Sequence, residues 1–145
     1  TRKTTPNLRL LDKYCVKKGG GHNHRYNLSD EILIKDNHIS AEGSLKTLVK
    51  KAIRTKKLVT VEIENIYQHK EINGLKFKRI LFDNLSTRQI KKCLKISKKN
   101  YKTEYSGNAT LKNIKNISKI GINRISVGAI THSAKSFDTS LRFKN

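Results

Sequence analysis

Apolar residues along the chain follow two spacings, and their order predicts one helix followed by strands and helices in alternation. Short runs rich in β-branched residues, typical of buried strands, cover residues 31–35, 58–64, 77–83, 101–107 and 124–129. Helical spacing of apolar residues covers residues 5–18, 44–57, 86–99 and 110–120, with a short helical tail from residue 131. This alternation predicts an α/β fold with a parallel sheet and crossover helices.

Sequence signals for helix ends accompany two of these segments. Thr5-Pro6 resembles an N-cap followed by proline at the first helical position, and Gly19 can end that helix. Ser86 and Gln89 form a capping-box pattern at the start of a later helix. We therefore expect a first helix from Thr5-Pro6 and another that begins after Ser86.

Polar residues gather where each predicted strand ends. The clusters are KDNH (35–38), EIEN (62–65), DN (83–84), SGN (106–108) and VGAITH (127–132). In a parallel α/β barrel the carboxyl ends of the strands share one face, and that face holds the active site. Turn chemistry alone explains Asn and Gly, but it does not explain Lys35, Glu64 and Asp83 together. The pattern favours an α/β barrel with a site at this face.

The chain is strongly basic, but this net charge alone does not identify its partner. The chain has 32 Lys and Arg against 11 Asp and Glu, a formal net charge of +21. Such a charge usually indicates nucleic acid or another polyanion. Here the charges are spread along the chain without aromatic interleaving, and Lys, Asn and Ile rise together in AT-rich coding sequences. Nucleic-acid binding is therefore the weaker alternative to compositional drift or general solubility.

Cysteine usage and hydropathy bear on the compartment. Cys15 and Cys93 stand alone without a CxxC motif, so we expect a reducing, cytoplasmic location without disulfides. No stretch approaches the roughly 18 apolar residues of a membrane span, and the N-terminus has no signal-peptide core. The chain contains no methionine, even at position 1, so we expect a processed chain or a fragment. Residues 1–145 are expected to form one domain.

Flexible and basic residues surround the first predicted strand, which is typical of anion binding. Gly20 and Gly21 permit close approach of backbone N–H groups, and arginine offers a planar fork to carboxylate or phosphate. The candidate donors are Arg2, Lys3, His24, Arg25 and Lys35. A zinc site formed by Cys15, His22 and His24 is the alternative, but a fourth ligand is not evident. His69 and Cys93 are expected to be a surface residue and a helix residue.

Two small-residue turns and two acids follow the later strands. Ser106-Gly107-Asn108 and Val127-Gly128-Ala129 are patterns that present backbone N–H groups and a helix N-terminus to phosphate, although each could be an ordinary tight turn. Glu64 and Asp83 end adjacent strands. Two acids beside a phosphate site suggest Mg²⁺ held through substrate oxygens. The alternative for both acids is N-capping of the following helices.

These motifs closely resemble one family over essentially the whole chain. TRKTTPNLR, GGGHNHR, LIKDNH, VEIEN, LFDN, YSGNATLKNI and ISVGAITHS are similar, in order, to motifs of the quinolinate phosphoribosyltransferases. The resemblance implies an incomplete TIM-like (β/α) barrel of the type II phosphoribosyltransferase kind. It also implies transfer of phosphoribosyl from phosphoribosyl pyrophosphate to quinolinate with decarboxylation, in NAD biosynthesis. It implies a homodimer or dimer-based oligomer without a membrane partner.

The resemblance also assigns roles to individual residues. The carboxylates of quinolinate would be bound by Arg2, His24 and Arg25, with Lys35 beside them. Lys3 would contact phosphoribosyl pyrophosphate, and Glu64 and Asp83 would bind ribose hydroxyls and the Mg²⁺-pyrophosphate group. The 5′-phosphate would be held by Ser106, Gly107, Asn108 and Gly128, near His132, and Val127 and Ala129 would be further substrate-binding residues. Thr1 joins the substrate-binding residues, and the catalytic candidates are Lys3, Lys35, Glu64 and Asp83.

The chain departs from the family in what it lacks. It begins where the family's first barrel strand is ending, so we expect that strand and the N-terminal sandwich domain to lie outside it. It also lacks the arginine that the sandwich domain of a partner subunit contributes. Asn108, where the family often has Gly, is tolerable because Asn accepts left-handed backbone conformations. We expect the C-terminal fragment of an enzyme, with an inactive phosphate-binding remnant and a basic nucleic-acid-binding protein as alternatives.

Overall fold

All strands of the central sheet run parallel and lie in chain order, β1-β2-β3-β4-β5, in a computed structural model that describes residues 1, 3–98 and 100–144. The strands are β1 (Ile32–Ile34), β2 (Val59–Ile63), β3 (Arg79–Asp83), β4 (Lys102–Ser106) and β5 (Arg124–Ile125). Successive crossover connections produce this order. The predicted parallel sheet is therefore confirmed.

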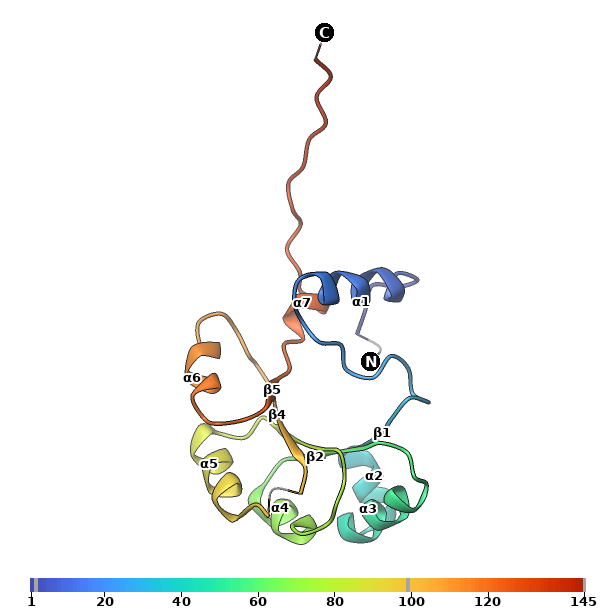
Figure 1. The fold of residues 1–145 in the computed structure, drawn as a ribbon, viewed down its shortest axis with the longest axis vertical. Helices are drawn as coiled ribbons and strands as arrows, with labels where there is room; N and C mark the ends of the chain where they lie inside the picture. The colour runs from blue at the N-terminus through green and yellow to red at the C-terminus, as the bar shows by residue number, and fades with distance from the viewer. Residues whose placement is uncertain (2, 99, 145) are drawn as a thin grey trace.

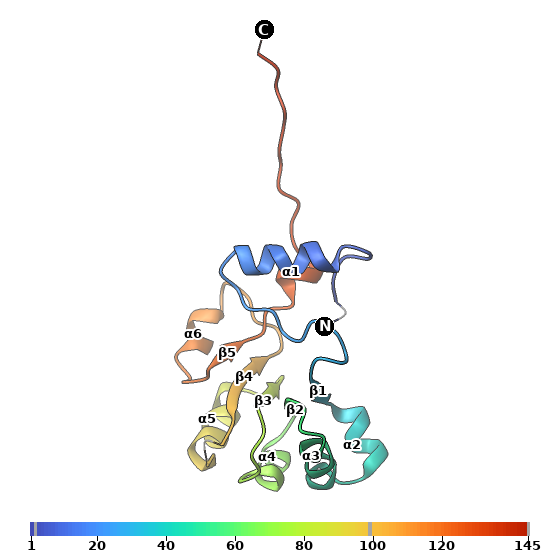
Figure 2. The same cartoon turned by 45° about the vertical axis from the view of Figure 1, so that its right-hand side comes forward.

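Most helices cover one side of this sheet. They are α1 (Arg9–Lys18), α2 (Asp36–Glu42), α3 (Leu45–Arg54), α4 (Ile66–Ile72), α5 (Thr87–Ile96), α6 (Ile114–Ser118) and α7 (Ala129–His132). Figure 1 shows α2 to α6 along the outer side of the curved sheet, and α1 next to α7 beyond its other side. Figure 2 shows the same arrangement from a second direction. Within the described residues, none of the helices has the length and apolar character needed to cross a bilayer.

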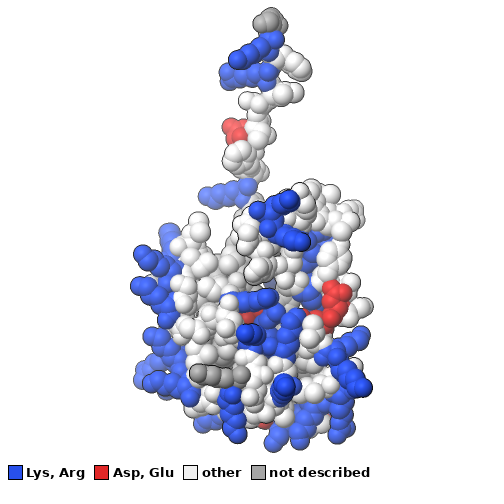
Figure 3. Space-filling view, viewed as in Figure 1, with Lys and Arg blue, Asp and Glu red and all other residues white. Residues whose placement is uncertain are grey.

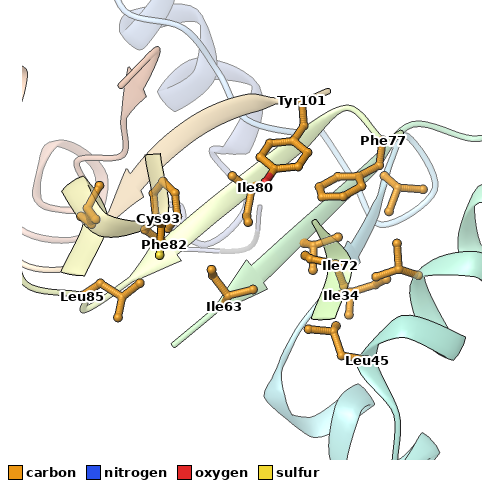
Figure 4. Packing of buried hydrophobic residues seen from close by; sticks show 14 of the residues in the cluster. Ile34, Leu45, Ile63, Ile72, Phe77, Ile80, Phe82, Leu85, Cys93 and Tyr101 are labelled. Atoms are coloured by element: carbon orange, nitrogen blue, oxygen red, sulfur yellow. The ribbon is translucent and has the colours of Figure 1, made fainter. Parts of the chain in front are cut away.

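The hydrophobic core lies between the sheet and the layer α2–α6. Alternate residues of the strands, such as Val61, Ile63, Ile80 and Phe82, are fully buried in this layer. Figure 4 shows helix residues such as Leu45 packed toward the same strands. Burying a side chain of this size contributes about 1.5–3 kcal/mol, so this face holds the strands in place.

His69 belongs to this core, and its expected surface position is wrong. It lies on α4 with no exposed area, and its Nε2 is 2.8 Å from the hydroxyl of Tyr101. Tyr101 in turn stacks on Phe77 with ring centroids 4.7 Å apart. Burial lowers the pKa of His69 below its usual value. Periodicity misplaced this residue because the segment between β2 and β3 was not recognised as a helix.

The ends of the helices agree only partly with the sequence signals. The capping box of Ser86 and Gln89 is present at the start of α5, as predicted. The predicted cap at Thr5-Pro6 is wrong, because α1 begins at Arg9. Thr5 instead donates its backbone N–H to Asp12 Oδ2 at 2.7 Å, which holds this stretch as a turn before the helix. The short helices α2 and α4 were not predicted.

The last part of the chain also differs from the prediction. The expected strand at 124–129 is confined to Arg124–Ile125, and α7 begins at Ala129. Residues 133–144 have no regular structure and extend away from the sheet, as Figures 1 and 2 show. Phe137 and Phe143 in this extension are 88% and 89% exposed, so they take no part in the core.

The buried histidine predicts a specific loss of stability in acid. Because the folded pKa of His69 is lowered, its contribution is complete above about pH 6.5 and is lost as the pH falls below that value. We expect His69→Gln to reduce the loss in free energy of unfolding between pH 7.5 and pH 5, by about 1.4 kcal/mol per unit of pKa lowering. Urea unfolding at both pH values measures this difference. His22→Gln replaces an exposed histidine and should lose as much free energy of unfolding between the two pH values as the wild type does. If His69→Gln also loses as much as the wild type, the assignment to His69 is wrong.

Candidate active site

One face of the sheet carries charged side chains. Successive residues of a strand point to opposite faces, so the apolar residues lie on one face and the charged residues on the other. The face turned away from α2–α6 carries polar residues in register on neighbouring strands. Thr60 pairs with Arg79 and Arg79 with Lys102; Glu62 pairs with Leu81 and Leu81 with Glu104; Asp83 pairs with Ser106. Charged side chains from several strands therefore share one surface, and its carboxyl-end edge is where parallel barrels place their active sites.

Arg25 fixes the segment that leads into β1. Its Nε donates to the hydroxyl of Thr1 at 2.8 Å, and its Nη1 donates to the backbone carbonyl of Glu31 at 2.9 Å. Lys13 donates to the carbonyl of Arg25 at 3.2 Å. These bonds bring Thr1 and Arg25 together, and they orient the guanidinium beside the start of the sheet.

Lys35 and Glu62 form an ion pair at the carboxyl ends of β1 and β2. Lys35 Nζ lies 3.3 Å from Glu62 Oε2; the lysine side chain is 45% exposed and that of the glutamate 12%. Burial raises the pKa of Glu62; Lys35 opposes this shift, and Asp83 adds to it. Glu62 was not among the site residues predicted from the sequence, although strand alternation places it on the same face as Glu64.

His24 lies against a buried ion pair in the middle of the charged face. Arg79 Nη1 is 2.7 Å from Glu104 Oε2, and both side chains are at most 5% exposed. Ser126 donates its hydroxyl to Glu104, and His24 Nε2 is 4.0 Å from Glu104 Oε1. Burial lowers the pKa of His24, and the carboxylate of Glu104 opposes this shift. Among the described residues, neither His24 Nε2 nor Arg79 Nε has a hydrogen-bond partner, although both atoms are buried.

A second buried acid, Glu31, precedes β1. Lys78 and Thr60 both donate to its carboxylate. Burial acts to raise the pKa of Glu31, but these hydrogen bonds outweigh burial and its pKa lies below the usual value. Glu31 therefore stays ionised, and it neutralises Lys78 at the amino-terminal side of the charged face.

The two acids predicted from the sequence lie at the expected edge. Asp83 is the last residue of β3 and is partly buried; Glu64 follows β2 and is exposed. The N-caps of the following helices are Asn65 and Ser86. The alternative of N-capping is therefore wrong for both acids.

The turn after β4 is built around Gly107. Gly107 has φ +107°, and Asn108 also adopts a left-handed conformation with φ +48°. A Cβ at Gly107 would lie 2.2 Å from Oδ1 of Asn84, which closes this position to any side chain. Helix α6 begins only at Ile114, so the expected helix N-terminus does not directly follow this turn. The turn offers backbone N–H groups alone.

The remaining candidates are placed as follows. Gly128 is the N-cap of α7, and a Cβ there would lie 2.7 Å from Nε2 of His132. Val127 is partly buried, whereas Lys3, Ala129 and His132 are exposed. Arg2 lies outside the described residues. The turns near Gly107 and Gly128 follow neighbouring strands β4 and β5 at the same edge of the sheet.

The donor set bears on which metal the chain could hold. In residues 1, 3–98 and 100–144 no three His, Cys, Asp or Glu side chains are grouped as metal ligands. The zinc alternative with Cys15, which is exposed on α1, has no support. The Mg²⁺ site expected at Glu64 and Asp83 stays a prediction. Two carboxylates suit this ion, because it keeps several waters and commonly needs one or two carboxylates plus substrate phosphates.

A surface cavity of about 660 Å³ lies elsewhere on the sheet. Phe77, Tyr101 and Asn123 line it together with other residues that precede or begin β3, β4 and β5. It therefore opens at the amino-terminal edge, opposite the candidate site, and active sites of parallel barrels are not found at that edge.

The fold and the charged face together define an α/β protein of the incomplete TIM-barrel kind. A family model described as "Quinolinate phosphoribosyl transferase, C-terminal domain" matches residues 1–142. The chain belongs to the quinolinate phosphoribosyl transferase family. The family resemblance expected from the motifs is thus confirmed.

Known relatives support the same membership. The chain is 44% identical to a "Probable nicotinate-nucleotide pyrophosphorylase [carboxylating]" of Bacillus subtilis, over 97% of this chain and 50% of that protein. It is 38% identical to the chloroplastic enzyme of that name from Arabidopsis thaliana, over 98% of this chain and 47% of the relative. The crystal structure of NadC from Streptococcus pyogenes superposes with a TM-score of 0.92 at 42% identity, covering 99% of this chain and 51% of that one. The chain thus spans about half the length of the curated relatives it matches.

The ion pair of Arg79 and Glu104 predicts a large stability effect. Glu104→Gln leaves Arg79 buried without a countercharge, and breaking such pairs typically costs about 3–5 kcal/mol in the free energy of unfolding. Urea unfolding measures this cost. Glu42→Gln removes a partner of Lys51 from a more exposed ion pair and should cost less than about 1 kcal/mol. If Glu104→Gln lowers the free energy of unfolding as little as Glu42→Gln does, the buried pair is not needed for stability.

Proposed function

We propose that this chain carries the substrate-binding face of a quinolinate phosphoribosyltransferase. The reaction joins quinolinate to phosphoribosyl pyrophosphate and yields nicotinate mononucleotide, pyrophosphate and CO₂. The observation that carries the proposal is the distribution of charge over one face of the sheet. Cations lie at the first strand, at Arg25 and Lys35, whereas an acid and a small-residue turn lie at β3 and β4, at Asp83 and residues 106–108.

Quinolinate binds at the β1 end in this proposal. Arg25 presents a planar guanidinium, which suits a carboxylate better than a point charge does. His24 Nε2 has no hydrogen-bond partner among the described residues, and Lys35 is half exposed at the end of the strand. Arg2 is assigned here from the family resemblance. Two carboxylates on one ring match several cationic donors at one place.

Phosphoribosyl pyrophosphate binds across β2 to β5. Asp83 and Glu62 lie on the charged face and would hold Mg²⁺ through substrate oxygens, with Glu64 at the outer edge for the ribose hydroxyls. The backbone of residues 106–108 and 127–129 would hold the 5′-phosphate. The left-handed turn at Gly107 and Asn108 and the N-cap of α7 at Gly128 would present their N–H groups. Lys3 and His132 are exposed at the periphery of this region.

The chemistry suits these residue types. Breakage of the bond between ribose and pyrophosphate leaves an oxocarbenium-like ribose, and fixed cations stabilise the leaving group. Bound Mg²⁺ supplies further charge neutralisation of the pyrophosphate. The pyridine nitrogen of quinolinate then attacks the ribose carbon and becomes positively charged. This charge stabilises the electron pair left on the adjacent ring carbon as CO₂ leaves, and that carbon then takes up a proton from water. The side chains position reactants and neutralise charge, and no nucleophilic residue is required.

A homodimer or a dimer-based oligomer is part of the proposal, because the family resemblance implies an arginine from a partner subunit.

The second candidate function, general polyanion binding, rests on the +21 charge. Figure 3 shows Lys and Arg side chains spread over the visible surface rather than gathered in one groove. A dispersed charge of this kind favours weak, salt-sensitive binding over a defined nucleic-acid site.

Quinolinate binding tests the β1 end. Lys35→Ala is expected to weaken quinolinate binding by about tenfold or more, the amount expected for loss of one charged hydrogen-bond donor. Isothermal calorimetry with quinolinate measures the dissociation constant. Lys51→Ala removes a lysine that also pairs with a glutamate, but on the helix layer, and should leave the affinity unchanged. Equal losses for both variants would indicate general charge attraction and would contradict the proposed site.

Phosphate binding tests the turn after β4. Gly107→Ala is expected to weaken binding of ribose 5-phosphate by about tenfold or more, because the new Cβ meets Asn84 and strains the backbone at φ +107°. Gly43→Ala is a matched control, with φ +78° but no atom within 4 Å of the new Cβ. Fluorescence or calorimetric titration compares the variants. Unchanged affinity in Gly107→Ala would remove this turn from the site.

A further inference from the structure

Asn84 connects two parts of the site that no motif joins. Its side-chain Nδ2 donates to Asp83 Oδ2 at 3.2 Å. Its backbone N–H donates to the carbonyl of Ser106 at 3.0 Å, one step beyond the last paired residues of β3 and β4. Its Oδ1 occupies the space where Gly107 would carry a Cβ. One residue therefore contacts both the acid of β3 and the turn of β4.

The backbone of Asn84 is held in an uncommon conformation. Its φ is +51°, a left-handed value that costs most residues about 1 kcal/mol or more and that Asn tolerates better. Asn84 is exposed and lies outside the hydrophobic core. Uncommon backbone angles at an exposed position next to a site are typical of residues that orient functional groups.

The contacts of Asn84 restrict the position of the Asp83 carboxylate. A hydrogen bond to one carboxylate oxygen, Oδ2, restricts rotation of the group and leaves Oδ1 outside this bond. Contact of the same side chain with Gly107 sets how far the carboxylate lies from the phosphate turn. A ligand with phosphate at one end and metal-bound pyrophosphate at the other needs this spacing to be fixed.

We propose that Asn84 is a positioning residue that couples the carboxylate of Asp83 to the phosphate-binding turn at Gly107. This inference rests on the proposed function, since it assumes that phosphoribosyl pyrophosphate spans the two groups. In this proposal Asn84 contacts neither the ribose carbon nor the pyridine nitrogen; it acts through Asp83 and the turn at Gly107. Its removal affects the Mg²⁺-dependent part of binding more than the binding of phosphate alone.

The decisive variant is Asn84→Gly in the full chain. Glycine adopts the left-handed backbone readily and keeps the N–H that bonds to Ser106, so only the side-chain amide is lost. Calorimetry gives the affinity for ribose 5-phosphate without Mg²⁺, and for phosphoribosyl pyrophosphate with and without Mg²⁺. We expect ribose 5-phosphate affinity to change by less than about twofold, whereas the gain in affinity caused by Mg²⁺ falls by about fivefold or more, as for loss of one hydrogen bond to a charged group.

A control variant and a cycle of variants separate this role from a structural one. Lys56→Gly also replaces a left-handed residue, φ +61°, but beyond the amino-terminal edge of the sheet, and should change neither affinity. In the cycle, Gly107→Ala should cost less ribose 5-phosphate affinity in the Asn84→Gly background, because the atom 2.2 Å from the new Cβ is gone. Additive effects would show that the two residues are not coupled.

The outcomes distinguish the inference from the function it rests on. If the wild-type chain binds neither ribose 5-phosphate nor phosphoribosyl pyrophosphate, the proposed function fails and the inference fails with it. If the wild type binds both ligands but Asn84→Gly keeps the full effect of Mg²⁺, only the inference is overturned. If Asn84→Gly loses both affinities equally, or no longer unfolds cooperatively, Asn84 supports the fold and the positioning role is also overturned.

Discussion

A strand in a parallel sheet places alternate residues on its two faces, and here the two faces have opposite character. One face is filled by residues such as Val61 and Phe82 and is closed by helices. The other face carries acids that lie too deep to be left unpaired. Arg79 with Glu104, Lys78 with Glu31 and Lys35 with Glu62 satisfy this requirement. A slip of one residue in any strand would exchange the faces, so the pairs and the core specify the same register.

The same pairing prepares the surface for anions. The deeper bases, such as Arg79, are neutralised by acids, whereas Arg25 is held by hydrogen bonds to uncharged oxygens of Thr1 and Glu31. Its positive charge therefore remains available beside β1. Glu62 on β2 is paired with Lys35, and Asp83 lies at the end of β3. A cation near β1 and an acid at β3 fit two ligands, one with carboxylates and one that brings a divalent cation.

Much of this arrangement was predictable from sequence, because strand order and strand ends follow from local patterns. β-branched runs identified the strands, and Ser86 with Gln89 identified the start of α5. His69 was misplaced because its burial depends on Tyr101, which is far along the chain. Glu62 was missed because the sequence does not distinguish it from Glu64 in the same motif. What distinguishes Glu62 is its ion pair with Lys35, a tertiary contact between β1 and β2. The contacts of Asn84 across β3 and β4 likewise needed the folded structure.

The central claim is that the carboxyl-end edge of the sheet, rather than the basic surface as a whole, binds the substrates. The most direct measurement is a residue-resolved NMR titration of the ¹⁵N-labelled protein with quinolinate and, separately, with phosphoribosyl pyrophosphate and Mg²⁺. The account predicts that quinolinate shifts the amides near His24, Arg25 and Lys35, and that phosphoribosyl pyrophosphate shifts those of Asp83 and residues 106–108. Shifts confined to the lysine-rich surface of α3 and α5, removed by moderate salt, would contradict it.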